Sequence, residues 1–173
     1  MGWKLDWRKF RQYLADKHGV TQAYMFIGYM SENESMYEYM HELGYLVVLK
    51  PTVDVKVPHQ QTGEGKDHAP RKEVEEPQKS MIKGNVDAEL VLYAMKELQN
   101  YSQAIIVSGD GDFFSLAEYL KENNKLSHIL TPNWQYSSLL KVFEPDIIRL
   151  DQLRKQLAYH DHHSKGRTPK ASN

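Results

Sequence analysis

Residues 104–113 read Ala-Ile-Ile-Val-Ser-Gly-Asp-Gly-Asp-Phe, and they are the most informative part of the sequence about the fold. Its first four residues are apolar without interruption, as a strand buried on both faces of a parallel sheet must be. A helix is predicted over residues 113–121 directly after it. In open parallel sheets, ligands gather outside the carboxyl ends of the strands, where loops lead into helices. Residues 108–112 are predicted to lie at such a place.

Strands and helices alternate on both sides of this stretch. Asp6 is the predicted N-cap of an opening helix that Gly19 ends, and Asp151 is the predicted cap of a last helix. The alternation is typical of a parallel sheet wrapped by right-handed crossovers, so the predicted fold class is α/β. The other predicted strands are 23–29, 45–49, 126–130 and 147–150, and the other predicted helices are 34–43, 86–100 and 137–142.

The length and composition of the chain indicate one globular domain. Its 173 residues are 40% hydrophobic and 26% charged, which is close to the composition of soluble globular proteins. The absence of cysteine excludes disulfides, thiolate metal sites and cysteine nucleophiles, so any metal must use oxygen or imidazole ligands. The sequence contains no signal peptide and no apolar run long enough for a membrane span, and we expect a cytoplasmic protein.

Two segments depart from the regular pattern. Residues 52–80 are rich in charge and proline after an alternating Val-Asp-Val-Lys-Val. We therefore expect a mobile excursion at 58–80 that begins with a short edge strand or hairpin. Residues 158–173 carry histidine and basic residues without periodicity, and we expect a disordered tail there. The folded domain is accordingly predicted to span residues 1–157.

The loop after the strand at 104–107 carries two carboxylates, Asp110 and Asp112, separated by one glycine. Two like charges this close repel each other unless a cation lies between them, and a divalent cation with oxygen ligands is the usual solution. We expect the glycines to let the backbone turn sharply and approach a ligand. The alternative for Asp112 is a structural one, in which it caps the following helix.

A third carboxylate, Asp87, lies in the first turn of the helix predicted before that strand. The helix dipole favours a carboxylate there in any protein, which is the structural alternative for Asp87. Its helix leads directly into the strand that carries Asp110, which favours a shared site. Ser108 and Asn133 follow neighbouring predicted strands and could orient water or phosphate, although serine and asparagine at strand ends also cap loops.

Four segments carry a resemblance to a known family. They are residues 83–95 (Lys-Gly-Asn-Val-Asp-Ala-Glu-Leu-Val-Leu-Tyr-Ala-Met), 104–113, 130–133 (Leu-Thr-Pro-Asn) and 137–140 (Ser-Ser-Leu-Leu). In this order they resemble the NYN domain, a PIN-like nuclease family that includes the LabA-like bacterial proteins. The resemblance implies a PIN-like, doubly wound parallel sheet flanked by helices. It also implies acidic residues that hold Mg²⁺ or Mn²⁺ and hydrolyse RNA phosphodiester bonds.

The resemblance also assigns roles to particular residues. Asp87, Asp110 and Asp112 match the acidic positions of the family, which implies that they are the catalytic metal ligands. Ser108, Asn133 and Lys83 are the candidates for contacts with the substrate, which we expect to be single-stranded RNA. Metal ions would activate the attacking water, neutralise the phosphate and stabilise the leaving oxygen.

The start of the sequence departs from the family pattern. The family begins with a central apolar strand that ends in an aspartate, a principal metal ligand, whereas this sequence opens with Met1-Gly2-Trp3. We therefore expect the first strand and the first acidic ligand to be missing. A catalytically weak or inactive module that binds RNA or a protein is the alternative function. A sheet without its central strand is also expected to pair with the edge of another chain, as in a homodimer.

Two further alternatives concern single residues. Tyr136, beside Trp134 in a predicted loop, is a candidate for stacking on an RNA base, and packing within the protein is its other interpretation.

A phosphatase or phosphotransferase with Asp110 as the nucleophile is a third functional class. No Asp-x-Asp motif at an upstream strand end supports that class.

Overall fold

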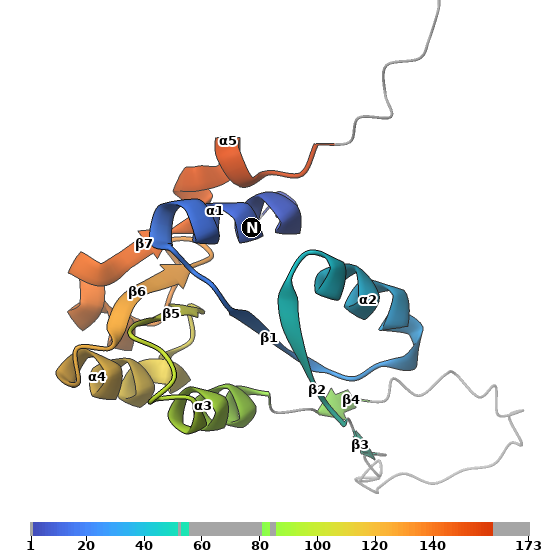
Figure 1. Ribbon diagram of the computed structural model, residues 1–173, viewed down its shortest axis with the longest axis horizontal. Helices are drawn as coiled ribbons and strands as arrows, with labels where there is room; N and C mark the ends of the chain where they lie inside the picture. Colours follow the sequence, from blue (N-terminus) through green and yellow to red (C-terminus); the bar gives the residue numbers. More distant parts are fainter. Residues whose placement is uncertain (1, 52, 56–80, 84–85, 161–173) are drawn as a thin grey trace, which may run out of the picture.

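The computed structural model describes residues 2–51, 53–55, 81–83 and 86–160 (Figure 1). Helices and strands alternate along these residues, as the sequence predicts. In chain order the elements are α1 (Trp7–His18), β1 (Ala23–Gly28), the 3-10 helix η1 (Ser31–Asn33), α2 (Glu34–Glu42), β2 (Tyr45–Lys50), β3 (Val53–Val55), β4 (Met81–Lys83), α3 (Asp87–Lys96), β5 (Ala104–Val107), η2 (Gly111–Phe113), α4 (Phe114–Glu122), β6 (Leu126–Thr131), η3 (Ser138–Asp146), β7 (Ile147–Arg149), η4 (Leu150–Leu153) and α5 (Arg154–Leu157).

The parallel sheet β5-β6-β7 lies between two layers of helices. Alternate side chains of a strand point to opposite faces, and this period separates the two cores. Ile106 and Ile129 pack with α3, α4 and η3 on one face. Ile105 and Leu130 pack with α1 and α5 on the other. Figure 1 shows these helices on the two sides of the sheet.

The second parallel sheet consists of β1 and β2. Ala23 and Tyr45 are buried under α2, where they pack with Met40. The ring of Phe26, on the opposite face of β1, lies 5.5 Å from the ring of Tyr93 in α3. Helix α3 therefore contacts both β1 and the core around β5, and it connects the two sheets.

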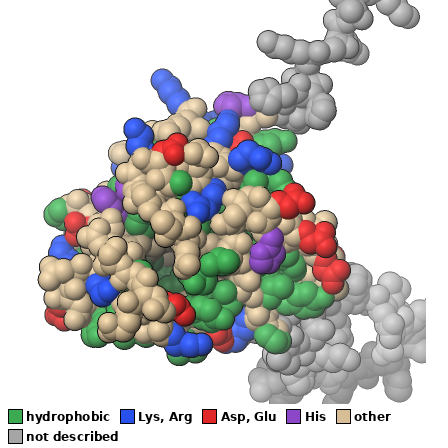
Figure 2. Space-filling view, viewed as in Figure 1, with side chains coloured by type: hydrophobic (Ala, Val, Ile, Leu, Met, Phe, Trp, Pro, Cys, Tyr) green, Lys and Arg blue, Asp and Glu red, His purple; other side chains and the backbone are tan. Residues whose placement is uncertain are grey.

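The predicted α/β class is confirmed, but the strands do not form one continuous sheet. Among the described residues, β1 and β5 each pair with one neighbour only, so each leaves one edge unpaired. Figure 2 shows a hollow between these two strands, with hydrophobic side chains around it. The predicted parallel sheet flanked by helices is confirmed. No described strand bridges β1 and β5, so the described part of the sheet is divided between these two strands.

Several local predictions can be compared with the structure. The N–H of Lys9 donates to Asp6 Oδ1 at 3.1 Å, which confirms Asp6 as the N-cap of α1. Gly19 ends that helix with a left-handed φ of 64°. The prediction for Asp151 is wrong, because this residue lies inside η4. Its carboxylate accepts hydrogen bonds from Arg149 at 2.7 and 3.1 Å, and these bonds lower the pKa of Asp151.

The outer segments of the prediction are only partly described. β3 pairs antiparallel with β4, as expected for a hairpin, whereas the excursion predicted at 58–80 lies outside the described residues. The packed part of the chain extends past the predicted boundary at residue 157. Ala158 is buried and bridges to Leu5, and the N–H of Tyr159 donates to the carbonyl of Lys4. The rest of the predicted tail, from residue 161, is not described.

No helix among the described residues is both long and apolar enough to span a membrane.

Candidate functional site

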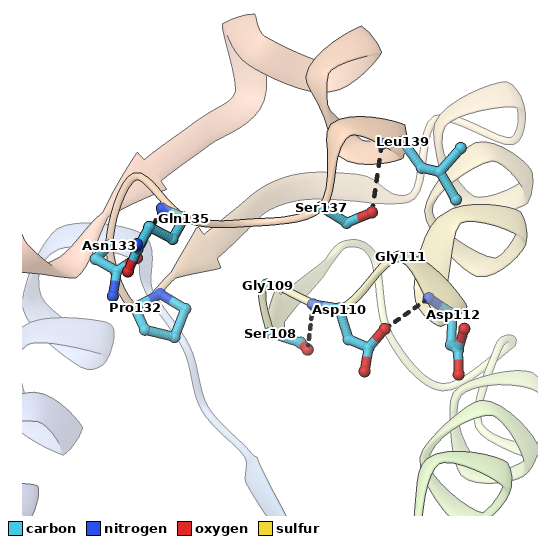
Figure 3. A pocket seen from close by; sticks show the side chains of 10 residues that line it. All are labelled: Ser108, Gly109, Asp110, Gly111, Asp112, Pro132, Asn133, Gln135, Ser137 and Leu139. Atoms are coloured by element: carbon cyan, nitrogen blue, oxygen red, sulfur yellow. Dashed lines mark hydrogen bonds between the residues drawn. The ribbon is translucent and has the colours of Figure 1, made fainter.

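A pocket of about 580 Å³ opens at the carboxyl ends of β5 and β6. The two strands are parallel neighbours with Val107 opposite Leu130, so their following loops leave the sheet at the same edge. Figure 3 shows the carboxylates of Asp110 and Asp112 pointing toward the same open side of the loop after β5. The lining residues are Ser108, Gly109, Asp110, Gly111, Asp112, Pro132, Asn133, Gln135, Ser137 and Leu139.

Asp110 is held in place by the turn that connects β5 to η2. Its backbone is extended, with φ −84° and ψ 135°, and it is the N-cap of η2. One carboxylate oxygen, Oδ1, accepts a hydrogen bond from the N–H of Asp112 at 3.0 Å. The N–H of Asp110 in turn donates to Ser108 Oγ at 3.1 Å. These bonds fix the direction of the Asp110 carboxylate and leave its second oxygen, Oδ2, for a ligand.

Asp112 is not a helix cap, so the structural alternative for this residue is wrong. The capping side chain is that of Asp110, two residues earlier, whose Oδ1 accepts from the N–H of Asp112, and α4 begins after Phe113 without a side-chain cap. Asp112 is exposed, and no hydrogen bond or ion pair with a described residue involves its carboxylate. A carboxylate at the rim of a pocket without a structural partner is available to bind a ligand.

The glycines of this loop have a different function from the one the sequence suggests. Neither Gly109 nor Gly111 has the left-handed backbone that only glycine adopts easily. A Cβ on Gly111 would overlap the Ser137 hydroxyl, and a Cβ on Gly109 would lie 3.2 Å from Tyr136 Cβ. The glycines therefore allow the loop after β6 to pack closely on the loop after β5. The N–H of Ser137 donates to the carbonyl of Gly109 at 2.9 Å across this contact.

Ser108 and Asn133 both line the pocket, and both also cap their own loops. Ser108 Oγ accepts from the N–H of Asp110, and Asn133 Oδ1 accepts from the N–H of Gln135 at 2.7 Å. The buried hydroxyl of Thr131 donates to the Asn133 carbonyl and anchors the end of β6. The loop-cap interpretation is confirmed for both residues, and a contact with substrate stays a prediction.

Asp87 is the first residue of α3, the position that the helix dipole favours for a carboxylate. Helix α3 contacts η2, the element that carries Asp112, although Asp87 does not line the pocket. Glu89 of the same helix forms an ion pair with Lys50 at 3.0 Å. Lys83 lies in β4, opposite Val53 of β3 in the hairpin, and it is not one of the residues that line the pocket.

The structure brings two of the three predicted acidic residues to one pocket. Within the described part of the chain, no three His, Cys, Asp or Glu side chains lie close enough together to hold a metal ion. The pocket nevertheless suits a hard cation, because all of its charged or polar side chains present oxygen atoms. Mg²⁺ is commonly bound through one or two carboxylates, with waters and substrate phosphates as the other ligands. Asp110 and Asp112 fit that kind of site.

The loop after β6 forms the pocket wall opposite Asp110 and Asp112. The sequence indicated only some of the residues of this wall. Pro132, Ser137 and Leu139 lie in the segments that carry the family resemblance, yet the residues alone assigned them no contact with the acidic loop. No sequence pattern indicated that Gln135 would line the pocket. The wall forms because β5 and β6 are adjacent and parallel, and that pairing joins residues far apart in the sequence.

Comparisons with known proteins agree with the fold and with the motifs. A crystal structure of a protein of unknown function from Vibrio parahaemolyticus is similar to this structure, with a TM-score of 0.63 and 19% sequence identity. The match covers 91% of this chain and 83% of that chain. No curated protein matches the sequence. The model of the NYN domain matches residues 1–150. This chain therefore belongs to the NYN domain family, within the PIN-like nuclease superfamily.

Proposed function

We propose that this protein is a divalent-metal-dependent ribonuclease that hydrolyses phosphodiester bonds of RNA in the pocket between the β5 and β6 loops. The observation that carries the proposal is the pair of exposed carboxylates, Asp110 and Asp112, lining one pocket at the carboxyl edge of a parallel sheet. Membership of the NYN family supports a nuclease role. The metal ions that we propose for this site are Mg²⁺ or Mn²⁺.

The charge of the pocket makes a cation necessary for this reaction. Asp110 and Asp112 are the charged side chains among the described residues that line it. They would repel a phosphodiester, which is itself an anion, at any distance short enough for chemistry. Asp110 and Asp112 would hold the divalent ion through carboxylate oxygens. When bound, the ion would neutralise the phosphate and lower the pKa of a water molecule that attacks the phosphorus.

Neighbouring residues would position the substrate. The Ser108 hydroxyl and the Asn133 side-chain amide can donate hydrogen bonds to phosphate oxygens. Ser108 Oγ already accepts from the N–H of Asp110, which leaves its proton free to point into the pocket. Asn133 Oδ1 accepts from Gln135, which likewise leaves the amide N–H groups for another acceptor. The loop bonds and the substrate bonds therefore use different atoms of the same side chains.

One observation favours a second candidate function, an RNA-binding or protein-binding module with weak or no catalysis. The described residues provide no third acidic side chain in the pocket. With two carboxylates, the site would bind a metal ion more weakly than a site with three or four, and catalysis would be correspondingly slower.

The test compares cleavage and metal binding in matched variants. Labelled single-stranded RNA is incubated with the protein and Mn²⁺, and Mn²⁺ binding is measured separately by electron paramagnetic resonance. We expect Asp110→Asn to abolish cleavage and weaken Mn²⁺ binding. Asp16→Asn removes the same charge from an exposed position on α1 and is the control. Cleavage at the wild-type rate in Asp110→Asn contradicts the site, whereas RNA binding without cleavage by the wild type favours the module.

A further inference from the structure

A second pocket, of about 440 Å³, lies on the other side of the loop that follows β6. Asn133 and Gln135 line the acidic pocket, whereas Trp134 and Tyr136 line the second one. The two pockets therefore share one short loop as their common wall. The remaining lining residues of the second pocket are Lys141, Glu144, Ile147, Arg149 and Gln152.

The two aromatic residues of this pocket differ in how firmly they are held. Tyr136 packs against the core around β5 and β6, and its Cβ lies in close contact with Gly109 of the acidic loop. Trp134 is 66% exposed and belongs to none of the hydrophobic clusters formed by the described residues. An indole ring on an anchored loop, unused by the core, is the arrangement with which proteins stack on an unpaired nucleobase.

The second pocket contains cations, which the acidic pocket lacks among its described lining residues. Lys141 and Arg149 line it together with one anion, Glu144, and the ion pair with Asp151 offsets part of the charge of Arg149. Asp151 holds Arg149 through Nε and Nη2, which fixes the guanidinium plane and leaves Nη1 for another acceptor. Cations beside an exposed ring suit a base and its flanking phosphate.

We propose that this second pocket binds a nucleobase of single-stranded RNA, stacked on Trp134 and Tyr136, and so presents an adjacent phosphodiester to the acidic pocket. The proposal deepens the proposed ribonuclease function and rests on it for the role of the acidic pocket. Stacking depends on the face of the base and not on its edge, so we expect little preference for particular bases. A base paired in a duplex cannot reach the rings, so we expect a preference for single strands.

The experiment measures RNA binding under conditions in which cleavage cannot occur. A fluorescently labelled single-stranded oligouridine is titrated with the full chain in the presence of EDTA, and binding is followed by fluorescence anisotropy. We expect Trp134→Ala to weaken binding roughly tenfold and Trp134→Phe, which keeps a ring, to weaken it much less. Tyr39→Ala removes an exposed ring from α2 and is the matched control, with binding unchanged.

The outcomes separate this proposal from the proposed function. Wild-type binding by Trp134→Ala overturns the stacking pocket, as does an equal loss in Trp134→Phe. If the wild type does not cleave RNA with Mn²⁺ but Trp134→Ala still loses binding, the ribonuclease proposal fails and the base pocket stands. Circular dichroism of each variant shows whether a loss of binding comes from unfolding, and thermal unfolding at the wild-type temperature is required before a loss counts as support.

Discussion

Gly111 and Ser137 are in such close contact that Gly111 has no room for a side chain. The two residues belong to the loops that follow β5 and β6, and their contact holds the two walls of the acidic pocket together. We predict that Gly111→Ala destabilises the protein by about 1–3 kcal/mol, since the new methyl group must displace a packed loop. Urea unfolding of the variant measures this difference.

A second substitution identifies the cause. The double variant Gly111→Ala with Ser137→Gly removes the Ser137 side chain that the new methyl group would overlap. It should regain part of the lost stability, because the free energies of two contacting residues are not additive. Gly109→Ala is the graded comparison, with its nearest neighbours at 3.2 and 3.3 Å, and should be less harmful. Equal stability of Gly111→Ala and the wild type would show that the loops can separate freely.

Asp110 has a structural role and a proposed chemical role, and two substitutions distinguish them. Asparagine keeps the side-chain oxygen that accepts from the N–H of Asp112, whereas alanine loses it. We expect Asp110→Ala to lower the free energy of unfolding by about 0.5–2 kcal/mol and Asp110→Asn to lower it much less. Cleavage of RNA should be lost in both. Activity retained in Asp110→Asn would assign the residue to capping alone.

Asp87 can be tested in the same way against its neighbour on α3. The family resemblance implies that Asp87 is a further metal ligand, so we predict that Asp87→Asn lowers the rate of RNA cleavage. Glu89→Gln, which disrupts the ion pair with Lys50, is the control and should keep cleavage. An Asp87→Asn variant that cleaves RNA at the wild-type rate would show that Asp87 is not a metal ligand.

His18 makes the stability of the protein sensitive to mild acid. Burial first, and then the nearby charge of His128, lower the pKa of His18 below its ordinary value of 6.5. The two rings lie 4.9 Å apart. A lowered folded pKa means that the unfolded chain binds the proton more readily, so stability is full above about pH 6.5 and falls as the pH drops below it.

The His128→Gln variant tests this sensitivity. Removing the second ring should make the loss of stability between pH 7.5 and pH 5.5 smaller, although the effect of burial on His18 remains. His41→Gln, at an exposed position on α2, should leave the loss unchanged. Urea midpoints at the two pH values provide the measurement, and an unaltered difference in His128→Gln would exclude the repulsion between the rings.

The unpaired edges of β1 and β5 lead to a prediction about assembly. An open strand edge with exposed apolar side chains tends to pair with another chain, so we expect a homodimer in solution. Val107 of β5 is 45% exposed, and Val107→Lys should shift the protein to the monomer because a charge on an edge strand opposes pairing. Light scattering after size exclusion measures the mass, with Leu92→Lys on α3 as the control. A monomeric wild type contradicts the expectation.

Much of the fold could be predicted because its elements are built from local patterns. The strand at 104–107 and the cap at Asp6 are as the sequence indicates, since an apolar run and an N-cap depend on neighbouring residues. The prediction of a helix cap at Asp151 was wrong for a related reason. A carboxylate before a helical segment fits the capping pattern, but the Asp151 carboxylate instead accepts two hydrogen bonds from Arg149, two residues earlier.

The alternation of strands and helices, the family, and the position of Asp110 and Asp112 at the end of a buried strand can be predicted from the sequence. The folded structure was needed to show that Asp110 and not Asp112 forms the cap, that the strands divide into separate sheets, and that the loop after β6 closes the pocket. Periodicity depends on residues that are near one another in the sequence, whereas strand pairing and loop contacts join residues that are far apart in the sequence and meet only after folding.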